Sequence, residues 1–71
     1  MTSKMSARLN YLADRMSRFA LASDNTSALV DVGHHLYDAR AVLTVGGADA
    51  APVAAELLGL AEEILDAEGV A

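Results

Sequence analysis

The chain is 71 residues long, contains no cysteine and carries a net charge of −5. This length allows one small domain without a disulfide framework, the negative charge opposes binding to polyanions, and no apolar run approaches the roughly 20 residues that cross a bilayer. We therefore expect a single helical domain over residues 1–71 in the cytoplasm. The absence of Cys and Trp beside abundant Ala, Gly, Asp and Val is typical of a GC-rich bacterial or phage source.

An amphipathic helix is predicted over residues 3–22. Apolar residues recur there at spacings of four and three, which places them on one side of a helix: Met5, Leu9, Leu12, Met16 and Phe19. A basic stripe with one aromatic residue lies directly beside it: Lys4, Arg8, Tyr11, Arg15 and Arg18. Cations around an aromatic ring can follow a phosphate backbone, so this stripe is a candidate nucleic-acid face. The alternatives are contact with an anionic membrane surface and a solvated or salt-bridged surface.

The segment Ser23–Ser27 supplies capping residues, and a second helix is predicted over 27–45. Its core stripe consists of Leu29, Val32, Leu36, Ala39 and Leu43. A neighbouring stripe consists of Val30, Gly33, Tyr37 and Thr44, with Arg40 along the same edge. A glycine inside a helix costs stability, which indicates close approach of another backbone, and Tyr and Arg are enriched at interface hot spots. This stripe is therefore a candidate interface, either between helices of one chain or between molecules.

The same helix contains the sequence DVGHHLYDAR, with two histidines between two acids. Asp31 with His35 and His34 with Asp38 are pairs four residues apart, the spacing that lets two side chains share a metal or a proton. Zinc needs three or four ligands, however, and one helix normally presents two. We therefore interpret this face as solvated and predict no metal, cofactor or catalytic residue. A pH-sensitive patch and a metal site completed across a dimer are the alternatives.

A third helix is predicted over 50–68, after the break at Gly46 and Gly47, with Asp49 as N-cap and Gly69 as C-terminal cap. Its apolar face is about twice as wide as the core of a small bundle needs. One stripe consists of Val53, Leu57, Leu60 and Ile64, and a second consists of Ala54, Leu58, Ala61 and Leu65. We expect the surplus to bind a partner through Leu57, Leu58, Leu60, Ile64 and Leu65. On this interpretation Leu58→Asp weakens association and leaves helicity largely intact.

The charges are sorted along the sequence. Residues 1–23 carry +3, residues 24–46 carry −2 and residues 47–71 carry −6, which together make the net charge of −5. The basic first helix and the acidic third helix are therefore expected to attract each other, in one chain or across a dimer. Alternatively, the acids of the third helix could mimic nucleic acid on a basic protein surface: Glu56, Glu62, Glu63, Asp66 and Glu68.

Together these patterns predict an all-α fold, a helical hairpin with a third amphipathic helix packed on it as a small three-helix bundle. Few large side chains are available for the core, so we expect oligomerisation, as a homodimer, to complete it. The predicted function is non-enzymatic: an accessory, regulator or inhibitor that acts through protein–protein contact. The alternatives are a nucleic-acid-associated module that uses the basic stripe and an acidic inhibitor that uses the third helix.

Overall fold

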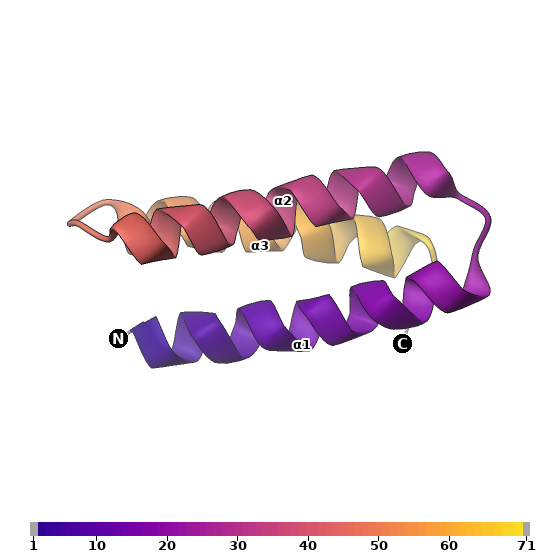
Figure 1. Cartoon of the computed structure of the whole chain (residues 1–71), viewed down its shortest axis with the longest axis horizontal. Coiled ribbons are helices and arrows are strands. Elements are labelled where there is room, and N and C mark those ends of the chain that lie inside the picture. Colours follow the sequence, from indigo (N-terminus) through magenta and orange to yellow (C-terminus); the bar gives the residue numbers. More distant parts are fainter. Residues whose placement is uncertain (1, 71) are drawn as a thin grey trace.

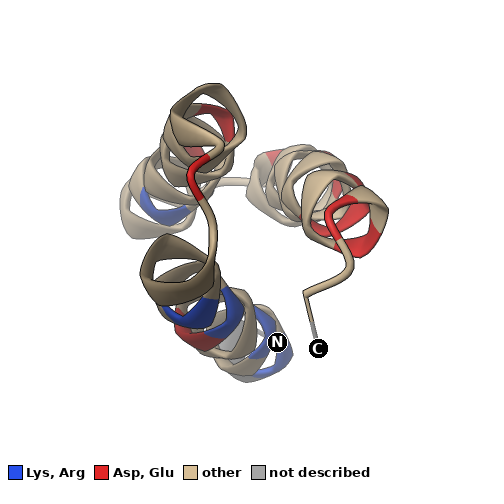
Figure 2. Ribbon diagram, turned by 90° about the vertical axis from the view of Figure 1, so that its right-hand side faces the viewer, with Lys and Arg blue, Asp and Glu red and all other residues tan. Residues whose placement is uncertain are grey.

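Three α-helices make up the computed structural model, which describes residues 2–70 (Figure 1). They are α1 (Thr2–Ala22), α2 (Thr26–Val45) and α3 (Ala50–Ala67). The three run alternately up, down and up, and viewed along the bundle they occupy the corners of a triangle (Figure 2). No strand occurs within residues 2–70, so the predicted all-α, three-helix fold is confirmed. The predicted helix ranges differ from these bounds by at most one residue at either end.

The two turns between helices are short and have their own hydrogen bonds. At the start of α2, the Asn25 side chain accepts a hydrogen bond from the Ala28 backbone N–H at 3.2 Å and caps the helix. At the end of α2, Gly46 and Gly47 adopt positive φ values of 77° and 103°, which glycine reaches without steric cost. Asp49 stands at the N-cap of α3 as predicted, but its side chain makes no capping hydrogen bond.

A Schellman motif ends α3. Gly69 has φ 76°, and its N–H donates to the Asp66 carbonyl at 3.1 Å while the Val70 N–H donates to the Leu65 carbonyl at 3.0 Å. Val70 packs against the core, which is the apolar contact that often accompanies this motif. The chain after α3 is thereby turned back toward α1.

The core is built from the predicted apolar stripes of all three helices. Its members are Leu9, Leu12, Phe19, Val32, Leu36, Ala39, Ala54, Leu58, Ala61 and Leu65. Alanines at positions 39, 54 and 61 are fully buried and let α2 and α3 approach closely, and these two helices pack together more extensively than either does with α1. In the described part of the chain, no helix is both long and apolar enough to cross a membrane.

Candidate interaction surfaces

The bundle has three outward surfaces, one between each pair of helices. We name them the α1–α3, α1–α2 and α2–α3 surfaces. Each is lined by the stripes that lie one residue before or after the core positions, because such residues flank the core on a helix. The three surfaces differ sharply in charge.

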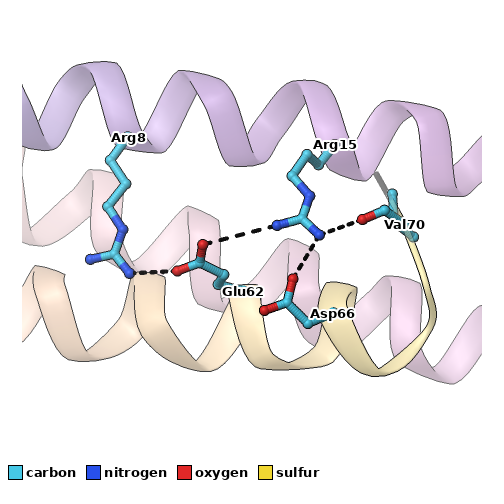
Figure 3. Close-up of polar contacts among 5 residues, drawn as sticks. All are labelled: Arg8, Arg15, Glu62, Asp66 and Val70. Carbon is cyan, nitrogen blue, oxygen red and sulfur yellow. Dashed lines mark hydrogen bonds and ion pairs between the residues drawn. The ribbon is translucent and has the colours of Figure 1, made fainter.

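The α1–α3 surface is closed by ion pairs. Arg8 Nη2 lies 2.9 Å from Glu62 Oε1, and Arg15 Nη2 lies 2.8 Å from Asp66 Oδ1 (Figure 3). Arg15 Nη1 also lies 4.0 Å from Glu62 Oε2, so one carboxylate bridges two arginines. The expected attraction between the basic and acidic helices therefore acts within one chain.

Arg15 is the buried centre of this network. Only 5% of the residue is exposed, its guanidinium also donates to the Val70 carbonyl, and it lies over the Tyr11 ring at 5.8 Å from the ring centroid. The hydrogen bond to Asp66 raises the pKa of Arg15, and burial opposes this rise only in part. Arg15 is therefore a structural cation.

These contacts reduce the number of cations that the candidate nucleic-acid face presents to a ligand. Of its five residues, Arg8 forms an ion pair with Glu62, and Arg15 is buried in an ion pair with Asp66. The chain's own acids therefore compete with any phosphate for these two cations. The acids proposed as a nucleic-acid mimic are also divided. Glu62 and Asp66 pair with arginines, and Glu68 accepts a hydrogen bond from Asn25 at 3.1 Å. Glu56 and Glu63 are exposed on the side of α3 away from these contacts.

The α1–α2 surface carries little charge and contains a groove. The groove lies between the two helices and is lined by Leu9, Ala13, Met16, Gly33, Leu36, Tyr37 and Arg40. A second hollow continues it past Leu9 and Arg40 to Ser6, Asn10, Leu43 and Thr44. Tyr37 is 72% exposed at the rim, and Val30 is exposed beside it. The predicted stripe of Val30, Gly33, Tyr37 and Arg40 thus lies together on one open surface.

Gly33 does not serve a close helix crossing within the monomer. A Cβ built there would meet only Met16 Sδ, at 3.8 Å, which is ordinary van der Waals distance. No backbone within residues 2–70 approaches it closely enough to require a glycine. Its effect in the described structure is instead to keep the floor of the α1–α2 groove open.

The α2–α3 surface carries the surplus apolar residues. Of the predicted interface residues on α3, Leu60 is 40% exposed and Leu57 and Ile64 are half-buried. Leu58 and Leu65 are fully buried in the core, so the prediction that they face a partner is corrected: their stripe packs into the core shared by the three helices. Val53 belongs to the exposed stripe as well, at 45% exposure.

Sequence reasoning missed one part of the α2–α3 surface. Val45 is 86% exposed, and it lines an apolar groove at the end of this surface with Ala41, Val42, Gly46, Asp49, Ala50 and Val53. The signal was present in the sequence, because Val45 falls outside the core stripe of α2 and immediately precedes the Gly46–Gly47 turn.

His34 lies on the outer side of α2, and His35 lies on the flank that faces α3. His34 is exposed and His35 is half-buried, with Asp31 and Asp38 exposed near them. Among the described residues no group of three or more His, Cys, Asp or Glu side chains could hold a metal ion.

Comparison with protein-family models, curated proteins and solved structures gives no match for this chain.

Proposed function

We propose that this chain is a non-enzymatic interaction protein that forms a homodimer through its α1–α2 surface. The observation that carries the proposal is the exposed Tyr37 at the rim of an open apolar groove. A large, solvent-exposed aromatic side chain beside an apolar groove is a common anchor of protein interfaces.

The charge distribution supports a symmetric contact here. The α1 edge of this surface consists of small and polar residues at helical spacing: Ser6, Asn10, Ala13, Ser17 and Ala20. Arg40 is the single charged residue lining the groove within the described part of the chain. In a two-fold dimer the same patch faces itself, so a nearly uncharged patch avoids the like-charge contacts that oppose self-association.

The geometry of such a dimer follows from the two-fold symmetry. Each protomer presents Tyr37 to the groove of the other, where Met16 and Leu36 supply apolar contacts. Gly33 at the floor provides room for the incoming ring. Burial of this surface also supplements a core in which three of the ten central residues are alanine.

The test is the oligomeric state of the full chain, measured by native mass spectrometry and sedimentation over a range of concentrations. We expect a dimer that Tyr37→Ser converts to monomer with unchanged helicity. Tyr11→Ser is the matched control, because Tyr11 is also exposed but lies on α1 beside Arg15. A wild-type monomer at all concentrations, or a dimer unaffected by Tyr37→Ser, would contradict the proposal.

A further inference from the structure

The α2–α3 surface combines an exposed apolar stripe with acids along both of its edges. Val53, Leu57, Leu60 and Ile64 each precede a core residue of α3 by one position and therefore share one flank of that helix. On the facing flank of α2, Asp31, His35 and Asp38 likewise each precede a core residue, and both acids are exposed. Beyond the stripe, on the outer side of α3, Glu56 and Glu63 are exposed.

Within residues 2–70, no Lys or Arg balances these acids on the same surface. Four of the five basic residues are in α1, and Arg40 lines the hollows of the α1–α2 surface instead. Figure 2 shows this separation, with blue concentrated on α1 and red on α2 and α3. The α2–α3 surface is therefore apolar along its middle and negative on both sides.

From this arrangement we propose that the α2–α3 surface binds a basic amphipathic helix of a different protein. A helix with apolar residues on one side and Lys or Arg on both flanks matches the stripe and its acidic edges at once. The stripe from Val53 to Ile64 extends about 16 Å at 1.5 Å per residue, so the partner helix needs about three turns. At the end of this surface, the groove beside Val45 can take one larger apolar side chain as an anchor.

A second copy of the chain does not fit this surface. In a two-fold contact Asp31, Asp38, Glu56 and Glu63 of one protomer would face the same acids of the other, and like charges placed together oppose association. Nucleic acid is repelled by the same carboxylates. This inference rests on the proposed function in one respect, that the chain acts by binding protein, but it assigns the hetero-partner to a different surface from the dimer contact.

The experiment measures binding of synthetic helices to the full chain by fluorescence anisotropy. The probe is a Leu/Lys peptide of about four turns with its leucines on one face, and the comparison peptides are its Leu/Glu counterpart and a scrambled Leu/Lys sequence. We expect saturable binding of the amphipathic Leu/Lys peptide alone, weakened by added salt.

Variants of the chain locate the site. Leu60→Ser should weaken binding about threefold or more, and Asp38→Lys about tenfold. Asp14→Lys makes the same change in net charge on an exposed position of α1 and should alter binding by less than about twofold. All three positions are exposed, so circular dichroism should show the same helicity and similar melting for each variant.

Three results would overturn the inference. They are the absence of saturable Leu/Lys binding, equal effects of Asp38→Lys and Asp14→Lys, and loss of self-association on Leu60→Ser. Failure of the proposed dimer is a separate result, since it is measured by the effect of Tyr37→Ser on oligomeric state. A monomer that binds the Leu/Lys peptide with the expected variant pattern would refute the dimer and support the hetero-partner surface.

Discussion

Replacing Gly33 with alanine should strengthen the fold and weaken the proposed dimer. Alanine is more favourable than glycine in a helix interior by about 0.8–1 kcal/mol, and the added methyl meets only Met16 Sδ at an ordinary 3.8 Å. For a domain of this size the gain raises the melting temperature by about 4–8 °C. In the dimer the same methyl occupies the groove that admits the partner's Tyr37, and overpacking of this kind costs about 1–3 kcal/mol.

The expected gain in folding stability and the expected loss of dimerisation can be measured separately with one control variant. Gly59→Ala gains the same helix propensity in α3, where a Cβ would meet nothing within 4 Å, and it lies away from the α1–α2 surface. Thermal unfolding followed by circular dichroism at several protein concentrations measures folding, and sedimentation measures association. We expect Gly59→Ala to be stabilised with normal dimerisation, and Gly33→Ala to be stabilised at low concentration with dimerisation weakened about tenfold.

Two outcomes would refute this reasoning. If the Gly33→Ala monomer is less stable than the wild-type monomer, the added methyl must clash with α1. Met16 Sδ would then lie closer to that methyl than the 3.8 Å in the structure. Equal dimerisation of the two variants would mean that the floor of the groove does not contact the other protomer.

Three further substitutions test the packing of the bundle, each by urea denaturation. Arg15→Ala should lower the free energy of unfolding by about 2–4 kcal/mol because it removes charged hydrogen bonds from a buried position. Arg8→Ala, in a half-exposed pair, should lower it by less than about 1 kcal/mol. Equal losses would contradict a special role for Arg15. Leu58→Asp should unfold the chain, since a loss of about 4 kcal/mol or more approaches the whole free energy of unfolding of a domain this small. Leu60→Asp, at an exposed position, should remain folded. A folded Leu58→Asp variant would contradict the core position of Leu58. Gly69→Ala should cost about 1–2 kcal/mol because φ 76° is unfavourable for alanine, and an unchanged midpoint would argue against the Schellman motif.

Local pattern was sufficient to predict the three helices. Spacings of three and four residues identified the core stripes of α1 and α2, and the capping roles of Asn25 and Gly69 follow from side-chain chemistry and backbone freedom that act within a few residues. Such short-range effects can be read from a single sequence.

Long-range choices could not be predicted in the same way. The two stripes of α3 look equally apolar in the sequence, and the stripe with Ala54 and Ala61 became the core because small residues allow α2 to approach closely. Similarly, Arg8 and Arg15 are equivalent by spacing, but only Arg15 meets the C-terminal turn of α3 and becomes buried. Both outcomes depend on how helices pack, which no single helix determines.

The unequal packing of the helices has a consequence for the order in which the molecule opens. α2 and α3 form a hairpin with extensive mutual contact, whereas the ion pairs that hold α1 to α3 join residues 47–54 positions apart. Contacts of that separation carry a large loop-closure entropy and form slowly, and the element with the fewest packing contacts is the first to open locally. Amide hydrogen exchange should therefore be fastest along α1. Transient detachment of α1 from the α2–α3 hairpin would expose Leu58 and Leu65, which are fully buried in the folded bundle.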